Sequence, residues 1–277
     1  MTIDTSSINF FYEINKKENN DSSNKIRETI LYRLLSNEIP KEWFIIDKRW
    51  NELKVELFKV IETDVYKIEL KGGRSNSYDF LLRNGNDLLK LELKYNADRI
   101  DKCPQFLNIS AINFIKGEDY ASYYYDNYLK AIAKLANIEI PEKEIYMKYI
   151  YNSNYDKHPF FRNLYNKDKD IEKEKKKIVD ESIKTYLNEI IELDIDEINK
   201  TFIEKEKDKL YLLYKKGRFY TDKIEEDELK VISIDKIKNN NTMILNTKSK
   251  TKIAMLLRWK NRKGVLYPAW QVSLINR

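Results

Sequence analysis

The segment from Tyr78 to Tyr95 constrains the fold of this chain more than any other part of it. Asn84-Gly85 near its centre is a strong signal for a two-residue hairpin loop, because both central positions of a type I′ turn need positive φ. With these two residues as the loop, Asp79 lies opposite Lys90. The segment therefore predicts a β-hairpin with a defined pairing of its two strands.

Alternation along the two strands sorts their side chains onto two faces of the hairpin. The polar face carries Asp79, Lys90, Glu92 and Lys94. The other face is wholly apolar and carries Tyr78, Phe80, Leu82, Leu89, Leu91, Leu93 and Tyr95. Asp79 and Glu92 are diagonal neighbours on the polar face, roughly 7–8 Å apart at Cα, which puts both carboxylates within reach of one small ion.

Two carboxylates and an ammonium on one face suit a hydrolytic metal site. Mg²⁺ prefers oxygen ligands and takes one or two carboxylates, which leaves positions for water and a substrate phosphate. A metal held in this way orients water, lowers its pKa and offsets charge on a phosphoryl group. Lys94 would deprotonate or position the water, or stabilise the phosphoryl charge, and a basic role would need a lowered pKa. The alternative is a solvated face on which Asp79, Glu92 and Lys94 form ordinary ion pairs.

The spacing of these residues resembles the PD-(D/E)XK signature, the active site of restriction endonucleases and of many repair and recombination nucleases. Asp79 is followed, after a gap of twelve residues, by Glu92-Leu93-Lys94, and Tyr78 stands where the family often has proline. The resemblance covers residues 20–130. It implies a mixed α+β fold with a restriction-endonuclease-like core, in which helices flank a central mixed sheet and the catalytic hairpin lies in the middle.

The resemblance also implies an activity, namely magnesium-dependent hydrolysis of double-stranded DNA, with Mn²⁺ able to replace Mg²⁺. Asp79 and Glu92 would bind the metal, the backbone carbonyl of Leu93 would be a further ligand, and Lys94 would act on the water or the phosphoryl group. A type II restriction-like enzyme is the first interpretation. The alternatives are a structure-selective repair or recombination nuclease and a non-catalytic DNA-binding protein that keeps the fold. Cleavage of a palindromic site would favour a two-fold homodimer.

Two further residues match the family in outline. Many members carry a glutamate on the helix before the core strands, and Glu28 lies in a helix predicted over Asn24–Ser36 with Ser22 or Ser23 as its cap. The alternative for Glu28 is a first-turn glutamate that complements the helix dipole. Several branches carry a glutamine after the lysine strand, and Gln105 follows Lys94 here.

The whole chain is expected to have three parts: a nuclease-like core over residues 1–165, a helical connection over 166–208 and a β-rich C-terminal lobe over 209–277. Residues 55–60 and 65–70 read as strands, and helical spacing covers 120–136, 167–191 and 196–206. A period of two then predicts an antiparallel sheet from strands at 210–214, 218–221, 231–234, 242–245, 253–259 and 269–274.

Residues 256–264 in this lobe combine cations with an aromatic ring, a pattern that suits phosphate contacts and base stacking. The expected DNA contacts are Arg258, Lys260, Arg262 and Lys263, together with Lys71, Arg74 and Lys102. The alternative is a solvated turn, with Trp259 and Trp270 in the core. The same choice between stacking on bases and burial applies to the tyrosines at positions 120, 123, 124, 125 and 128.

Composition limits the remaining possibilities. The chain has 51 Lys and Arg against 45 Asp and Glu, a mild excess that differs from the strongly basic balance of a pure nucleic-acid binder. One cysteine, Cys103, excludes an internal disulfide and suits a reducing compartment. One histidine, His158, makes histidine-based zinc sites a poor interpretation. Without a secretory signal pattern or an apolar run of about 18 residues, the chain is expected to be intracellular and to bind no membrane.

Overall fold

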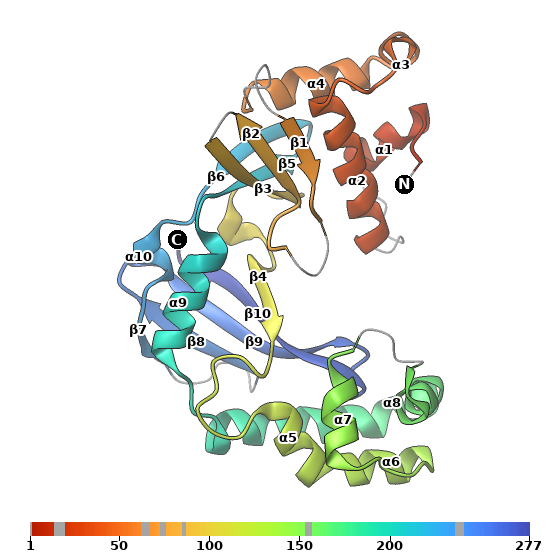
Figure 1. Ribbon diagram of the computed structural model, residues 1–277, viewed down its shortest axis with the longest axis vertical. Coiled ribbons are helices and arrows are strands. Elements are labelled where there is room, and N and C mark those ends of the chain that lie inside the picture. Colours follow the sequence, from red (N-terminus) through yellow and green to blue (C-terminus); the bar gives the residue numbers. More distant parts are fainter. Residues whose placement is uncertain are drawn as a thin grey trace. The chain divides into compact units, whose positions relative to one another are not determined.

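The computed structural model describes residues 2–13, 20–61, 67–72, 76–84, 87–152, 157–235 and 241–277. It has two five-stranded sheets flanked by helices (Figure 1), so the mixed α+β class is confirmed. The chain divides into two compact units. Unit 1 comprises Met1–Cys103 and Glu204–Glu225, and unit 2 comprises Pro104–Ile203 and Glu226–Arg277.

Unit 1 is built on a mixed sheet with the strand order β1-β2-β3-β5-β6. Its strands are β1 (Lys67–Leu70), β2 (Phe80–Asn84), β3 (Asp87–Tyr95), β5 (Lys209–Lys215) and β6 (Arg218–Asp222). The pairs β1–β2, β2–β3 and β5–β6 are antiparallel, whereas β3 and β5 run parallel. The strand that carries Glu92 therefore lies in the centre of the sheet.

Helices at the start of the chain pack against the apolar face of this sheet. They are a 3-10 turn (Thr5–Ile8), α1 (Asn9–Tyr12), α2 (Asn20–Leu35), α3 (Lys41–Ile46) and α4 (Arg49–Phe58), and a second 3-10 turn (Ile100–Lys102) follows β3. The core joins helix residues to alternate strand residues, among them Leu31, Leu34, Trp50, Leu53, Phe80, Leu82, Leu91 and Leu212. Burial of alternate residues leaves the remaining positions of β2 and β3 on the opposite, polar face.

The β2–β3 hairpin keeps its predicted faces but not its predicted register. Lys90 pairs with Leu81, whereas the predicted register placed it opposite Asp79. A shift by two residues leaves every side chain on its original face, because the side-chain period of a strand is two. The observed register also sets apolar side chains opposite one another.

Two local predictions for the helices were wrong. Residues 49–58 form α4, although 55–60 read as a strand, because Trp50, Leu53 and Leu57 recur at helical spacing and are buried. Helix α2 begins at Asn20, so Ser22 and Ser23 lie inside it and are not its caps. Val55, whose β-branched side chain favours a strand, is 48% exposed and contributes little to packing.

The hairpin of β5 and β6 belongs to unit 1, whereas the sequence places it in the C-terminal sheet. Lys209 and the run Tyr211–Tyr214 are buried, a nearly continuous pattern that is typical of a strand covered on both faces. The compact units therefore divide the chain differently from the predicted parts 1–165, 166–208 and 209–277.

Unit 2 joins an antiparallel sheet to a group of helices. The sheet order is β4-β10-β9-β8-β7, with β4 (Leu107–Ser110), β7 (Val231–Ile234), β8 (Thr242–Thr247), β9 (Lys252–Asn261) and β10 (Leu266–Ile275). The helices are α5 (Tyr120–Tyr124), α6 (Lys130–Ala136), α7 (Lys143–Ile150), α8 (Pro159–Thr185), α9 (Ile195–Glu206, whose last three residues belong to unit 1) and α10 (Glu226–Leu229). π-helical turns over Tyr125–Leu129 and Tyr186–Ile190 continue α5 and α8, so the three predicted helical segments are confirmed.

The aromatic side chains of unit 2 form its core. Tyr120, Tyr124 and Trp270 are completely buried, and Trp259 is 7% exposed. The Trp259 indole N–H donates a hydrogen bond of 3.3 Å to the Tyr120 hydroxyl. For these residues, burial is confirmed over stacking on bases. None of the described helices has the length and apolar character needed to cross a membrane.

Candidate active site

Polar side chains from several elements of unit 1 gather around Asp79 and Glu92. They are Glu28 of α2, Asp79 directly before β2, Glu92 and Lys94 of β3, Glu206 at the end of α9, and Lys209 and Tyr211 of β5. The sequence predicts the first four of these residues at the site. The structure brings all four together and adds the last three.

The orientation of Asp79 is fixed by the neighbouring strand. Its Oδ2 accepts a hydrogen bond of 2.8 Å from the backbone N–H of Leu93, and its own N–H donates to the carbonyl oxygen of Leu91 at 3.0 Å. The other oxygen, Oδ1, lies beside Gly72. A Cβ placed on Gly72 would stand 3.7 Å from Asp79 Oδ1 and 2.9 Å from Glu28 Oε2. The missing side chain of this glycine thus leaves space that two carboxylates share.

The carboxyl groups of Asp79 and Glu28 both have raised pKa values. Burial and then the charge of Glu92 raise the pKa of Asp79 to about 6, against the Leu93 hydrogen bond and the nearby lysines. Burial and then the charge of Asp79 raise the pKa of Glu28 to about 7. Carboxylates show such shifts where negative charge is desolvated and incompletely compensated, a condition that a bound cation relieves.

Glu92 lies between two lysines. The ammonium of Lys94 donates to Glu92 Oε1 at 2.5 Å, and the ammonium of Lys209 is 2.9 Å from Glu92 Oε2. The Lys209 contact is an ion pair only, because Oε2 accepts no hydrogen bond from any residue that the structure describes. The Lys209 side chain is completely buried and that of Glu92 is 14% exposed.

Lys94 is held as a cation. Burial lowers its pKa, but the attraction of Glu92 and the hydrogen bond to it, followed by the charge of Asp79, outweigh burial, so the pKa of Lys94 is raised. A general base needs a pKa close to the working pH. Of the roles that the sequence leaves open for Lys94, this environment favours holding water or stabilising phosphoryl charge over removing a proton.

Sequence reasoning missed Glu206, Lys209 and Tyr211. Glu206 Oε1 accepts a hydrogen bond of 2.7 Å from Lys209, and its Oε2 accepts one of 2.5 Å from the Tyr211 hydroxyl. The parallel pairing of β5 with β3 sets Tyr211 directly beside Glu92. One sequence feature could have indicated them. Lys209 begins an apolar strand of the kind that is buried on both faces, and a buried lysine needs a charged partner.

The charges of the site match one divalent cation. Four carboxylates (Glu28, Asp79, Glu92 and Glu206) and two ammonium groups (Lys94 and Lys209) leave two formal negative charges. The described residues contain no group of three or more His, Cys, Asp or Glu side chains arranged to enclose a metal. Mg²⁺ does not need such a cage, because it keeps several waters and binds through one or two carboxylates. Asp79, with Glu92 or Glu28, fits an ion of this kind.

Of the other predicted catalytic and DNA-contact residues in the first half of the chain, the structure describes Gln105, Lys71 and Lys102. Gln105 belongs to unit 2, where its amide oxygen accepts a hydrogen bond of 3.4 Å from Asn108. Lys71 forms an ion pair of 2.8 Å with Glu69. Arg74 lies outside the described residues, and Lys102 is 61% exposed at its side chain. The catalytic role of Gln105 and the DNA contacts of the three cations stay predictions.

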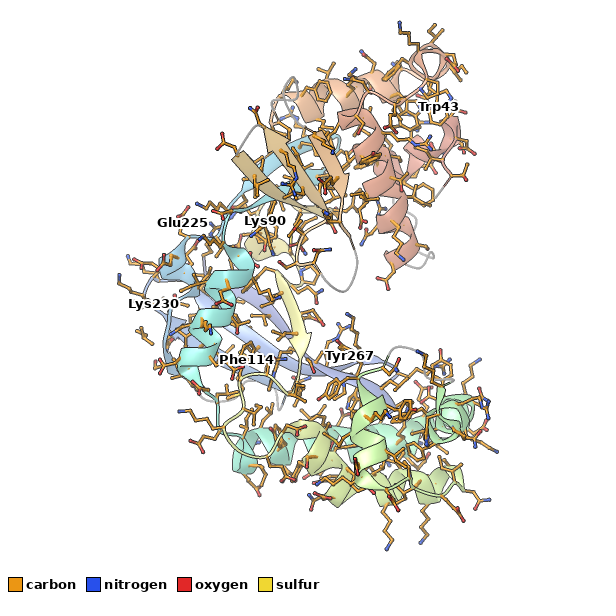
Figure 2. The ribbon with its side chains drawn as sticks, viewed as in Figure 1. Trp43, Lys90, Phe114, Glu225, Lys230 and Tyr267 are labelled. Atoms are coloured by element: carbon orange, nitrogen blue, oxygen red, sulfur yellow. The ribbon has the colours of Figure 1, made fainter. Side chains whose placement is uncertain are left out.

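The basic segment of β9 and β10 is tied to unit 2 by its own side chains. Arg262 lies 2.9 Å from Asp168 of α8. The other cations also have partners: Lys263 pairs with Asp180, Arg258 donates to Gln271 at 2.6 Å, and Lys260 lies 5.5 Å from the ring centre of Tyr267, a residue that Figure 2 labels. DNA contact by this segment stays a prediction, and for Arg262 and Lys263 it would require exchange of an ion pair with α8.

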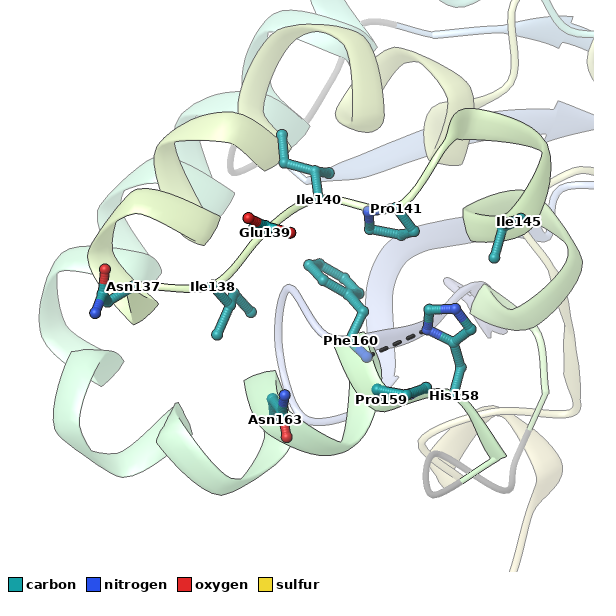
Figure 3. Close-up of a pocket in the computed structure, with 10 residues that line it drawn as sticks. All are labelled: Asn137, Ile138, Glu139, Ile140, Pro141, Ile145, His158, Pro159, Phe160 and Asn163. Atoms are coloured by element: carbon teal, nitrogen blue, oxygen red, sulfur yellow. Dashed lines mark hydrogen bonds between the residues drawn. The ribbon is translucent and has the colours of Figure 1, made fainter.

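A groove of about 520 Å³ lies in unit 2, between the α6–α7 connection and the start of α8 (Figure 3). His158 borders it, and the His158 Nδ1 accepts a hydrogen bond of 3.2 Å from the backbone N–H of Phe160. The single histidine therefore caps α8. The other ionisable residue that lines the groove is Glu139, so the lining lacks the gathered charges seen in unit 1.

Comparison of the chain with protein-family models, with curated proteins and with solved structures finds no match. The function is therefore inferred from the residues of the site and their geometry.

Proposed function

We propose that this protein is a magnesium-dependent endonuclease with a restriction-endonuclease-like core, which hydrolyses phosphodiester bonds of double-stranded DNA. One observation carries the proposal: Asp79, Glu92 and Lys94 gather on the polar face of a single hairpin, with the Glu28 carboxylate beside Asp79. A helix precedes the hairpin, the hairpin carries both halves of the motif, and it belongs to a mixed sheet. This order agrees with the resemblance to PD-(D/E)XK nucleases.

Different residues of the chain would have different roles in such a reaction. A bound Mg²⁺, or Mn²⁺ in its place, would activate water and offset charge on the phosphoryl group. Asp79 Oδ1 and the Glu92 carboxylate are the proposed metal donors, with the Leu93 carbonyl as a further donor and Glu28 acting directly or through water. The Leu93 N–H keeps Asp79 turned so that Oδ1 stays available. The Lys94 ammonium would hold the attacking water or the phosphoryl oxygens.

A type II restriction-like enzyme, acting as a two-fold homodimer on a palindromic site, is the specific form we propose. A structure-selective repair or recombination nuclease would use the same residues. A non-catalytic DNA-binding protein is disfavoured by the presence of Asp79, Glu92 and Lys94 together.

Digestion of a long DNA duplex with magnesium, followed by sequencing of the ends, tests the proposal. Discrete fragments with a shared end sequence support restriction, and a smear or cutting only at branched substrates supports the structure-selective nuclease. DNA binding without cutting by wild-type protein, in Mg²⁺ and in Mn²⁺, would reject the nuclease and support the non-catalytic alternative. Ca²⁺ should support binding without cleavage, because its larger and looser coordination activates water poorly.

A further inference from the structure

Lys209 is shared between two carboxylates of the candidate site. Its ammonium lies 2.7 Å from Glu206 Oε1 and 2.9 Å from Glu92 Oε2. The side chains of Lys209 and Glu206 are 0% and 2% exposed, so water does not hydrate either charge. Buried charges of this kind are retained only with a partner, and Lys209 is the cation that both carboxylates share.

The two contacts of Lys209 are unequal. The contact with Glu206 is a hydrogen bond, whereas the contact with Glu92 lacks the geometry of one. Glu206 is also held on its other oxygen by the Tyr211 hydroxyl at 2.5 Å. If the Lys209 ammonium moved away from Glu92, it would therefore keep its hydrogen bond and its ion pair with Glu206.

The chain fixes Lys209 in this position through its backbone. Asp208, between α9 and β5, adopts the left-handed conformation with φ of 59°, which turns the chain sharply from Glu206 to Lys209. Lys90 of β3 (Figure 2) secures the turn: its backbone N–H donates to the Asp208 carbonyl at 3.2 Å, and its ammonium donates to the Lys207 carbonyl at 3.0 Å. The backbone of Lys209 is thus fixed beside β3 by contacts that do not involve the Glu92 carboxylate.

We infer that Lys209 competes with the divalent cation for Glu92: it neutralises Glu92 in the metal-free protein, and Glu206 retains it when a cation binds. The inference rests on the proposed metal site. Lys209 is then a positioning residue that makes cation binding weaker than the carboxylates alone would allow. A lysine with a purely structural role would have the opposite signature, because its loss would disturb Glu92 and weaken cation binding.

Titration of the metal-free protein with Mn²⁺, followed by the electron paramagnetic resonance signal of free Mn²⁺, tests the inference without DNA. The main variant is Lys209→Met/Glu206→Gln, which removes one charge of each sign and leaves the net charge unchanged. Because Glu92 Oε2 is then free of its competitor, we expect Mn²⁺ to bind about tenfold more tightly. A double variant that folds normally by circular dichroism and binds Mn²⁺ equally well or more weakly would overturn the inference.

A single variant supplies a result of opposite sign. In Glu206→Gln the lysine has only Glu92 as a charged partner, so Mn²⁺ should bind more weakly than to wild type. The control for the lost charge is Asp98→Asn. The control for removal of an ion pair is Lys215→Met/Asp98→Asn, a pair 2.9 Å apart and about one third exposed, which should leave Mn²⁺ binding unchanged. Tighter Mn²⁺ binding by Glu206→Gln would also overturn the inference.

The outcomes separate this inference from the proposed nuclease. Absence of saturable Mn²⁺ binding by wild-type protein would reject the metal site and the inference with it. Tighter binding by the double variant, in a protein that cuts no DNA, would support the competition by Lys209 and reject only the nuclease.

Discussion

The backbone N–H of Leu93 donates a hydrogen bond of 2.8 Å to Oδ2 of Asp79, fourteen positions earlier in the chain. The bond links the acidic residue that precedes one strand to the middle residue of the Glu92-Leu93-Lys94 motif in the next. It leaves Asp79 Oδ1 on the side of Gly72 and Glu28. The register of one hairpin thereby decides which carboxylate oxygen is available to a ligand.

The first prediction concerns the central residues. Asp79→Ala, Glu92→Ala and Lys94→Ala should each reduce DNA cleavage by at least about 10²–10³-fold, because the first two remove a proposed metal donor and the third removes the ammonium that would act on developing charge. DNA affinity, measured in Ca²⁺, should change little. Arg83→Ala is the matched control, since Arg83 alternates onto the same face of the hairpin but forms an ion pair of 3.0 Å with Glu69. A folded Glu92→Ala protein that cuts at a rate close to wild type would refute the site.

The second prediction concerns stability and pH. Folding raises the pKa of Asp79 from 3.8 to about 6, chiefly through burial and the charge of Glu92. The folded state therefore binds more protons between these values, and stability falls as the pH rises through this range. In EDTA, Asp79→Asn should raise Tm at pH 8, by the equivalent of ~1–3 kcal/mol, and change it little at pH 4.

Asp98→Asn is the control for that measurement. Its hydrogen bond with Lys215 lowers the pKa of Asp98, so loss of this carboxylate should slightly lower Tm at pH 8. If Asp79→Asn also lowered Tm at pH 8, the uncompensated negative charge assigned to the site would be wrong.

The third prediction uses Gly72. A Cβ at this position would stand 2.9 Å from Glu28 Oε2, which lies at the end of a flexible side chain. Gly72→Ala should therefore displace the Glu28 carboxylate, weaken Mn²⁺ binding and slow cleavage, while Tm changes little. Gly117→Ala is the control, because no described atom lies within 4 Å of its Cβ position. Wild-type metal affinity in Gly72→Ala would show that Glu28 has no part in cation binding.

The fourth prediction separates anchoring from DNA contact in unit 2. Arg262 donates to Asp168 at 2.9 Å and lies 4.0 Å from the ring centre of Tyr165. Arg262→Ala should cost about 1–3 kcal/mol of unfolding free energy, because a partly buried carboxylate loses a charged partner. Lys260→Ala should leave stability unchanged and, if the segment contacts DNA, reduce the slope of log affinity against log salt by about one. An unchanged slope in Lys260→Ala would remove Lys260 from the DNA interface.

Local patterns in the sequence predicted much of unit 1. The two faces of the hairpin follow from alternation alone, and helical spacing placed Glu28 in the helix that precedes the core strands. The register depended on which residues form the turn, and the Asn84-Gly85 signal placed it two residues away from the observed pairing. Because the register differs by two residues, which is the side-chain period of a strand, Asp79 stays on the polar face and only its position along that face changes.

Long-range pairing could not be predicted from local patterns. Residues 209–222 read correctly as two strands, but nothing within them specifies β3 as the neighbour of β5. Without that pairing, Lys209 is only the first residue of a strand and Glu206 only the last residue of a helix. The three residues that sequence analysis missed are those whose place at the site depends on this one strand pair.

Unit 1 is formed by two separate segments of the chain, Met1–Cys103 and Glu204–Glu225. This also sets the order in which the residues of the site come together during synthesis. The hairpin with Asp79, Glu92 and Lys94 leaves the ribosome more than a hundred residues before β5, which pairs with β3. Until then the edge of β3 is open, Glu92 lacks the Lys209 ammonium, and closure of a long loop must precede the pairing. A nascent chain that stops within residues 104–203 would carry the complete motif in an incomplete sheet, so the polar face is finished only after β5 has been translated.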